Sequence, residues 1–321
     1  MTTEYSTHRV MLYRGMLDLI GNTPLVELQH LSPSAEVRFF AKLEGQNPTG
    51  SVKDRIARMM IEMGERDGRL TPGCTILEPT SGNTGVSLAF VAKLKGYNVR
   101  VVMPDNVSEE RSQILRAYGA EIIFSEGLKG TNGSIEVAQE LAARDPSLVM
   151  LYQYGNEGNP RAHYETTGPE ILRDLPEVDV FIAGLGTGGT LTGTGRYLKE
   201  HKPDVKVIAA APHPGDLVQG LRSLEDGFIP PVLDQSLLDG RIVVDSKSSF
   251  ASAKELMDKE GIFAGISGGA VLRTAQRAAQ RFEKANIVML LADGGWKYLS
   301  SNLWNADYSN LPEDIDAKVW W

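Results

Sequence analysis

Short apolar runs alternate with helical patterns along most of the chain. Eight runs read as strands: VRFFAKLE, TILEP, NVRVVMP, EIIFSE, LVMLYQYG, VDVFIAG, VKVIAAAP and NIVMLLADG. The stretches between them carry apolar residues at helical spacing. This alternation predicts an α/β fold in which parallel strands are covered by helices on both faces.

Eight strands suit two doubly wound, mostly parallel sheets better than one. We expect a smaller α/β domain at residues 43–155 and a larger domain formed by residues 1–42 and 156–321. The N-terminal segment GNTPLVEL is expected to return to the larger domain, and the Gly- and Asn-rich YGNEGNP marks the boundary. The irregular part between APHPGD and DSKSSF reads as surface loops.

Composition narrows the class of protein. Of the 321 residues, 42% are hydrophobic and 23% are charged, which is typical of a soluble globular protein with a sizeable core. The net charge of -8 argues against a nucleic-acid partner. Cys74 alone cannot form an internal disulfide, and the five histidines show no metal-ligand spacing, so no metal is expected. Without a signal-like or membrane-spanning apolar run, a cytoplasmic location is predicted.

The segment NPTGSVKDR places Lys53 in an unusual position. The helical stripe that follows runs through Ile56, Met59, Met60 and Met63, and Lys53 falls on the same face. It also lies in the first turn, where the positive end of the helix dipole repels a cation. A partly buried lysine there should have a lowered pKa, which suits a nucleophile or base. A lone lysine more often extends to solvent.

The glycine-rich loop GLGTGGT follows a predicted strand and opens a helix near Leu191. Gly184, Gly186 and Gly189 satisfy G-x-G-x-x-G, which would indicate a dinucleotide site. However, the next strand ends VIAAAP without the acidic residue that binds the ribose. The loop can still bind a phosphate through backbone N–H groups and the helix N-terminus, aided by Thr187 and Thr190. A merely tight turn is the alternative.

A second loop, EPTSGNTG, also joins a strand to a helix. Thr80, Ser81, Asn83 and Thr84 place four donors in five positions, more than one helix cap uses, and they suit a small carboxylate.

Three further positions are weaker candidates on their own. In GISGGA, Ser267 alone is better explained as a helix N-cap. Arg222, in VQGLRSLEDGF, would ordinarily be a solvated surface residue. Lys297 and Tyr298 follow the last strand and could line a cleft at its carboxyl end.

A phosphate-binding loop and an inward lysine together suit an aldehyde cofactor that carries a phosphate, such as pyridoxal 5'-phosphate. The segments GNTPLV, NPTGSVKDR, EPTSGNTG, YQYGNEGNP, GLGTGGTLTG and GISGGA, in this order and spacing, resemble the cysteine synthase family of pyridoxal-phosphate enzymes from about residue 14 to about 300. The resemblance implies fold type II, like the β subunit of tryptophan synthase, with the cofactor in the cleft between a mobile smaller domain and a larger one. It also implies a homodimer.

The resemblance further implies the role of each site residue. Lys53 would form the internal aldimine, and Asn83 would lie beside the ring hydroxyl of the cofactor. Ser267 would face the pyridine nitrogen, and the phosphate would be held by Gly186, Thr187, Gly188, Gly189 and Thr190. The substrate carboxylate would be bound by Thr80, Ser81, Thr84 and Gln153. The expected reaction is a β-replacement, through an aminoacrylate, that forms cysteine.

These motifs leave the choice of activated serine open. The chain most resembles an actinobacterial branch that uses O-phosphoserine, in which an arginine at the position of Arg222 binds the phosphate. That branch takes sulfur from a thiocarboxylated small carrier protein and has an aromatic C-terminal tail, here AKVWW. We therefore expect Trp320 and Trp321 to pack into the cleft or to form a dimer contact. The alternatives are O-acetylserine with free sulfide and, in another class, a nucleotide-binding dehydrogenase.

Overall fold

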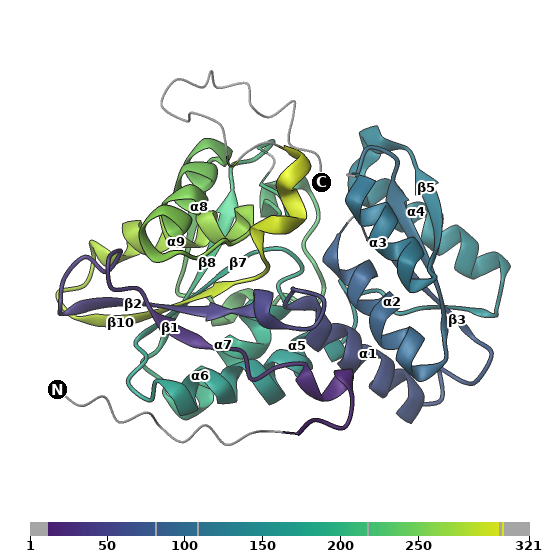
Figure 1. The fold of residues 1–321 in the computed structure, drawn as a ribbon, viewed down its shortest axis with the longest axis horizontal. Helices are drawn as coiled ribbons and strands as arrows, with labels where there is room; N and C mark the ends of the chain where they lie inside the picture. Colours follow the sequence, from purple (N-terminus) through teal and green to yellow (C-terminus); the bar gives the residue numbers. More distant parts are fainter. Residues whose placement is uncertain (1–11, 81, 108, 217, 302–303, 305–321) are drawn as a thin grey trace.

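Two β-sheets with flanking helices form the two halves of the molecule. The computed structural model describes residues 12–80, 82–107, 109–216, 218–301 and 304. In Figure 1, β2, β7, β8 and β10 lie in one half, and β3 and β5 lie in the other with α2, α3 and α4. The two-sheet α/β fold predicted from the sequence is confirmed. The division at residues 43 and 155 stays a prediction.

The larger sheet has six strands. Their spatial order is β1 (Leu25–Glu27), β2 (Val37–Leu43), β10 (Ala285–Leu291), β7 (Val180–Gly184), β8 (Lys206–Pro212) and β9 (Gly240–Val244). In the described part of the chain, β1 and β2 pair antiparallel and the other neighbours pair parallel. The N-terminal segment therefore returns to this sheet, as predicted.

The smaller sheet has four parallel strands. Their order is β5 (Glu121–Ser125), β4 (Asn98–Pro104), β3 (Thr75–Pro79) and β6 (Leu148–Met150). All eight predicted strands are present. The prediction of surface loops between APHPGD and DSKSSF was partly wrong, because β9 lies there and pairs with β8 at the sheet edge. Its side chains are mostly half-exposed, so the segment lacks the continuous apolar run of the buried strands.

Helices flank the sheets in both halves of the molecule. The α-helices are α1 (Lys53–Arg66), α2 (Asn83–Lys95), α3 (Glu109–Tyr118), α4 (Gly130–Arg144), α5 (Gly158–Ala162), α6 (Gly168–Asp174), α7 (Gly189–His201), α8 (Ser246–Glu260) and α9 (Ile266–Ala279). A π-helical turn, η4 (His163–Thr167), joins α5 to α6. The 3-10 helices are η1 (Met16–Leu19), η2 (Glu44–Gln46), η3 (Gly127–Lys129), η5 (Leu224–Asp226), η6 (Gln235–Leu237) and η7 (Gly295–Ser301).

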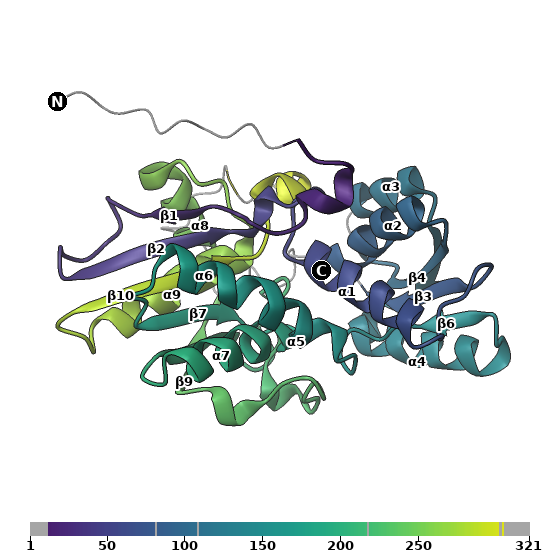
Figure 2. The same ribbon diagram turned by 90° about the horizontal axis from the view of Figure 1, so that it is seen from below.

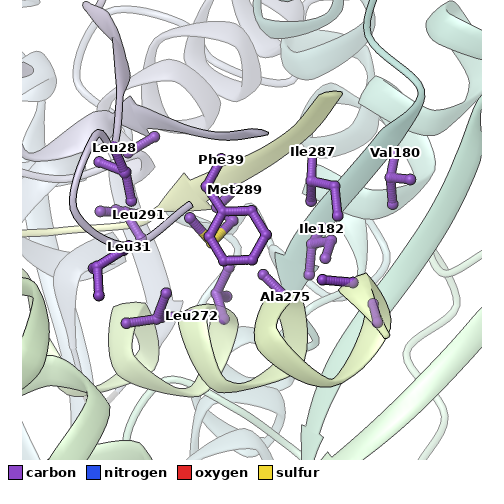
Figure 3. Close-up of a cluster of buried hydrophobic side chains, with 14 of the residues drawn as sticks. Leu28, Leu31, Phe39, Val180, Ile182, Leu272, Ala275, Ile287, Met289 and Leu291 are labelled. Atoms are coloured by element: carbon purple, nitrogen blue, oxygen red, sulfur yellow. The ribbon is translucent and has the colours of Figure 1, made fainter. Parts of the chain in front are cut away.

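Each half has its own apolar core. In the larger half, Phe39 and Met289 on the sheet pack with Leu272 and Ala275 of α9 (Figure 3). Figure 2 shows α1 at the boundary between the two halves, near α5. The buried face of α1 belongs to the core of the smaller half and includes Ile56 and Met60, as predicted. In the described ranges, no helix combines the length and apolar character that crossing a membrane requires.

Candidate active site

The loop before Lys53 is held in place by contacts with α1 and with the segment that follows β10. The carboxylate of Asp54 accepts hydrogen bonds from the backbone N–H of Thr49 at 2.7 Å and from its hydroxyl at 2.5 Å. Gly50 adopts a φ of +75°, and a Cβ there would lie 2.4 Å from the Trp296 ring. The backbone N–H of Val52 donates to the Ala292 carbonyl at 2.9 Å, after β10. The start of α1 is thus fastened to the larger sheet while its buried face packs with the smaller half.

Lys53 begins α1 and lines a cavity between the two halves. Burial lowers the pKa of its amine to about 8, although the nearby Asp293 carboxylate opposes the shift. An appreciable share of the amine is therefore uncharged near neutral pH. The prediction that this lysine points inward is confirmed, since its neighbours in the cavity are Asn83, Ser267 and the glycine-rich loop.

The glycine-rich loop follows β7 and opens α7. Gly188 has a φ of +85°, and a Cβ on Gly186 would lie 2.6 Å from the carbonyl oxygen of Gly220. Both positions therefore need glycine. The Thr187 hydroxyl accepts from Asn159 Nδ2 at 2.9 Å and from the backbone N–H of Gly189 at 3.3 Å. The loop thus presents a rigid helix N-terminus to the cavity, which is suited to an anion.

His163 is a buried residue that sequence reasoning did not single out. Its Nε2 lies 3.1 Å from Thr190 Oγ1, and its Nδ1 lies 2.9 Å from Thr167 Oγ1. Burial lowers its pKa well below the usual range, and the charges of Arg55 and Lys53 lower it further. The ring is therefore neutral and orients the Thr190 hydroxyl at the glycine-rich loop. No local motif marks this histidine, because its partner lies 27 positions away in sequence.

The loop after β3 faces a second cavity that adjoins the first. Thr80, Thr84 and Gln153 line it together with Lys53. The hydroxyl of Thr84 donates to Gln153 Oε1 at 2.7 Å, which leaves the Gln153 amide N–H groups available to an acceptor. Ser81 lies outside the described residues.

Glu78 is a second residue missed from the sequence. Its carboxyl oxygens accept the backbone N–H groups of Tyr152 at 2.8 Å and Gln153 at 2.9 Å. Burial raises its pKa to about 8, in spite of these two donors. Tyr152 has a φ of +57°, so Glu78 stabilises an uncommon backbone turn that brings Gln153 to the second cavity.

Arg222 lines the second cavity, where the resemblance places it, rather than lying apart on the surface as its local sequence alone would favour. Its guanidinium lies over the rings of Tyr154, at 5.4 Å, and Phe228, at 4.8 Å. Its Nη1 also lies 3.4 Å from Asn132 Oδ1, on α4 of the opposite half. Arg111 lines the same cavity and was missed from the sequence.

Ser267 lies in the first turn of α9, but the N-cap of this helix is Gly265. The interpretation of Ser267 as an N-cap is therefore wrong, and its buried side chain lines the first cavity instead. Tyr298 lines both cavities, and Lys297 is buried beside Asn83. The expectation that these two residues line a cleft is confirmed for Tyr298, whereas Lys297 lines a neighbouring cavity with Asn83 and Trp296.

The two cavities bring the predicted residues together. The first is lined by Lys53, Asn83, Gly186, Thr187, Gly188, Thr190 and Ser267, and the second by Thr80, Thr84, Gln153 and Arg222. Gly189 packs its Cα against Asn159 behind the loop. Among the described residues, no group of His, Cys, Asp and Glu side chains could hold a metal ion. Trp320 and Trp321 lie outside the described residues.

Comparisons with known proteins agree with this arrangement. The family model described as "Pyridoxal-phosphate dependent enzyme" matches residues 16–293. A "Probable cysteine synthase" of Bacillus subtilis is 42% identical over 300 residues, which cover 90% of this chain and 96% of that protein. The crystal structure of a cysteine synthase (OASS) from Entamoeba histolytica superposes with a TM-score of 0.89 at 34% identity, covering 98% of this chain and 96% of that one.

A further structure, an O-acetyl serine sulfhydrylase (isoform 3) from Entamoeba histolytica, superposes with a TM-score of 0.85 at 33% identity. It covers 95% of this chain and 96% of that one. The similarity therefore extends over both sheets and both cavities.

Proposed function

Because the chain belongs to the family of pyridoxal-phosphate dependent enzymes, among the cysteine synthases, we propose that it replaces the β-substituent of an O-activated serine by sulfur and so forms cysteine. The observation that carries this proposal is the position of Lys53. Its half-buried amine, with a pKa of about 8, shares one cavity with the glycine-rich loop. The rival interpretation as a nucleotide-binding dehydrogenase is set aside, since the matching family model spans both sheets.

The residues present fit the family's cofactor, pyridoxal 5'-phosphate. Its aldehyde requires an amine and its phosphate requires a cradle of N–H and hydroxyl donors, and Lys53 and the loop at residues 186–190 offer both in one cavity. A Cβ on Gly186 would disturb that cradle. When bound, the cofactor acts as an electron sink for negative charge at the α-carbon of an amino acid.

We assign each polar side chain that lines the first cavity a role in holding the cofactor. Lys53 would bond to the aldehyde, and Thr187 and Thr190 would donate to the phosphate. Ser267, a neutral hydroxyl, would face the ring nitrogen, while Asn83 would face the ring hydroxyl. A serine at that nitrogen does not hold it protonated as an aspartate would, which favours elimination over transamination.

Lys53 would also move the proton in the reaction. An amine whose pKa is about 8 can accept the α-proton of the substrate at neutral pH and return it at the end of the cycle. Thr80, Ser81, Thr84 and Gln153 would bind the substrate carboxylate. The free N–H groups of the Gln153 amide support this role, because the Thr84 hydroxyl occupies its oxygen.

O-acetylserine is the first candidate substrate, with free sulfide as the sulfur donor. An O-acetyl serine sulfhydrylase and a cysteine synthase (OASS) are among the similar structures. O-phosphoserine is the second candidate, and Arg222 favours it. The guanidinium lines the cavity that holds Thr84 and Gln153, where it could bind a phosphate leaving group. With O-phosphoserine, the proposed sulfur donor is a thiocarboxylated carrier protein. A homodimer is proposed with either substrate.

The deciding experiment supplies the purified protein with sulfide and either O-acetylserine or O-phosphoserine. Cysteine should form, together with acetate or phosphate in equal amount, and the Lys53→Ala variant should form none. The wild type should also show a visible absorption band that borohydride removes. Wild-type protein that lacks this band and forms cysteine from neither substrate would contradict the proposal.

A further inference from the structure

Asn83 is held by two residues from the opposite half of the molecule. It is the first residue of α2, which packs on the smaller sheet. Its Nδ2 donates to Asp293 Oδ2 at 2.7 Å, and its Oδ1 accepts from Lys297 Nζ at 2.7 Å. Asp293 and Lys297 follow β10 of the larger sheet. The Asn83 side chain, which lines the first cavity, is thus held by residues of the larger half although it belongs to the smaller half.

The chemistry of these two neighbours determines which way the Asn83 amide faces. A carboxylate only accepts hydrogen bonds and an ammonium group only donates them. A flipped amide would place its oxygen against the Asp293 carboxylate and its N–H groups against the Lys297 ammonium. Both contacts would then be repulsive. The N–H side of the amide therefore faces Asp293 and the neighbouring Tyr298 hydroxyl, and its oxygen faces Lys297.

Asp293 is itself rigidly placed. Its Oδ2 also accepts from the hydroxyl of Tyr298 at 2.5 Å, and only 4% of the residue is exposed. Its other oxygen packs so closely against Gly265 that a Cβ there would lie 2.0 Å away. Lys297 is 8% exposed, and its Nζ lies 5.2 Å from the centre of the Trp296 ring. Neither partner of Asn83 has room to change its position without repacking.

We propose that Lys297 and Asp293 are positioning residues that fix the orientation of the Asn83 amide, so that its N–H side and not its oxygen is presented to an acceptor oxygen of the bound cofactor. This inference rests on the proposed function and deepens it. The two residues make no contact with substrate in this assignment. They act by preventing the amide from presenting its oxygen to the first cavity, where an acceptor on the cofactor would be repelled.

A simpler explanation is that these contacts only hold the two halves together. The two explanations differ in what a substitution changes. Loss of a purely structural contact lowers the melting temperature and leaves the bound cofactor's spectrum as it was. Loss of the orienting contact changes the hydrogen bond to the cofactor, and with it the visible absorption band and the affinity.

The test compares holoenzymes of Lys297→Met, Lys297→Arg, Asn83→Ala and the double variant Lys297→Met/Asn83→Ala. Lys297→Met should alter the visible band and weaken cofactor binding about tenfold in equilibrium dialysis, the effect of losing one hydrogen bond to a charged group. Lys297→Arg should retain the wild-type spectrum. The double variant should bind no more weakly than Asn83→Ala. Lys95→Met, at the far end of α2, is the matched control. It should have the visible band and the cofactor affinity of the wild type.

A Lys297→Met holoenzyme with the wild-type band and cofactor affinity would overturn the inference, whatever its melting temperature. So would a double variant in which the two losses of affinity multiply, because Lys297 would then act independently of Asn83. Failure of the proposed function is a separate result. It would appear in the wild type, as a missing borohydride-sensitive band, before any variant is compared.

Discussion

Arg55 and Glu170 form a buried, two-pronged ion pair, with Nη1 to Oε1 and Nη2 to Oε2 both at 2.7 Å. The same guanidinium donates from Nε to Glu44 at 2.8 Å, and Lys42 lies 2.8 Å from the second Glu170 oxygen. Arg55 lies two positions after Lys53 on α1, and Glu170 lies on α6. This cluster joins the helix that carries the reactive amine to the larger half.

Replacing Arg55 with Met should destabilise the protein strongly. Two buried carboxylates would lose their principal partner, which typically costs about 3–5 kcal/mol. Urea unfolding of the wild type and the variant measures this difference. Arg58→Met is the matched control, because Arg58 pairs with Glu62 on the exposed side of the same helix and its loss should cost less than about 1 kcal/mol. Equal losses in both variants would contradict the assignment.

The same cluster predicts a loss of stability in acid. Burial alone would raise the pKa of Glu170, but its hydrogen bonds and ion pairs with Arg55 and Lys42 lower it from 4.5 to about 2. Between these values the unfolded chain binds the proton more readily, so this stabilisation is present above pH 4.5 and is lost as pH falls towards 2. The expected contribution is about 3 kcal/mol. Urea unfolding at several pH values should show a shallower decline in Glu170→Gln.

Lys53→Met should stabilise the cofactor-free protein at neutral pH. The folded-state pKa of about 8 lies below the usual 10.5, so burial of the ammonium group costs free energy at pH 7. The cost should be about 2 kcal/mol, less than the full shift implies because the side chain keeps some solvent contact. As pH rises from 8 to 10.5 the wild type should gain stability and the difference should shrink. A difference that is the same at pH 7 and pH 10.5 would refute this account.

Gly186→Ala should reduce cofactor retention at least tenfold. The added Cβ would lie 2.6 Å from the Gly220 carbonyl oxygen, so the phosphate-binding loop must move. A displacement of this kind in a packed region also costs about 1–3 kcal/mol of stability. Cofactor content after dialysis and the urea midpoint report the two effects. Gly240→Ala is the control, since its nearest neighbouring atom lies 4.0 Å from the added Cβ.

Arg222→Ala should separate the two candidate substrates. If the guanidinium binds a phosphate, its loss should lower kcat/KM for O-phosphoserine by about 10- to 100-fold, as for a hydrogen bond to a charged group. The value for O-acetylserine should change by less than about threefold, because an acetyl group carries no charge to bind. Steady-state kinetics with both substrates gives the answer. Equal losses on both would remove the phosphate-binding role of Arg222.

Much of the fold followed from the sequence because buried parallel strands have a strong local pattern. β9 was missed because it lies at the sheet edge and is mostly half-exposed. The cavity-lining residues were found because they occupy short loops after strands, where glycine, threonine and asparagine cluster. Helical spacing indicated the inward direction of Lys53, and the phosphate-binding loop elsewhere in the chain favoured it over extension to solvent.

The supporting residues could not be predicted in the same way. Glu78 reads as an ordinary strand residue, yet it holds the backbone of Gln153, 75 positions away. Asp293 contacts Asn83 across 210 positions, and His163 has no motif around it. Ser267 and Arg222 were placed at the site only by the family resemblance, since their local sequence favoured a helix cap and a surface residue and only the tertiary fold brings them to the cavities. A local sequence pattern predicts secondary structure and the side chains of loops. It does not show which residues, distant in sequence, orient those side chains.

The hydrogen bond from Val52 to the Ala292 carbonyl fixes the residue before α1 to the larger sheet. If the smaller half moved to admit an amino acid, Thr84 would move with α2, whereas Lys53, the residue directly after Val52, would move little. Substrate could then enter as the smaller half moves away, while Lys53 keeps its position in the cavity. Cavity opening and amine reactivity would then depend on different parts of the protein. A substitution in the smaller half could slow substrate entry and leave the chemical step unchanged.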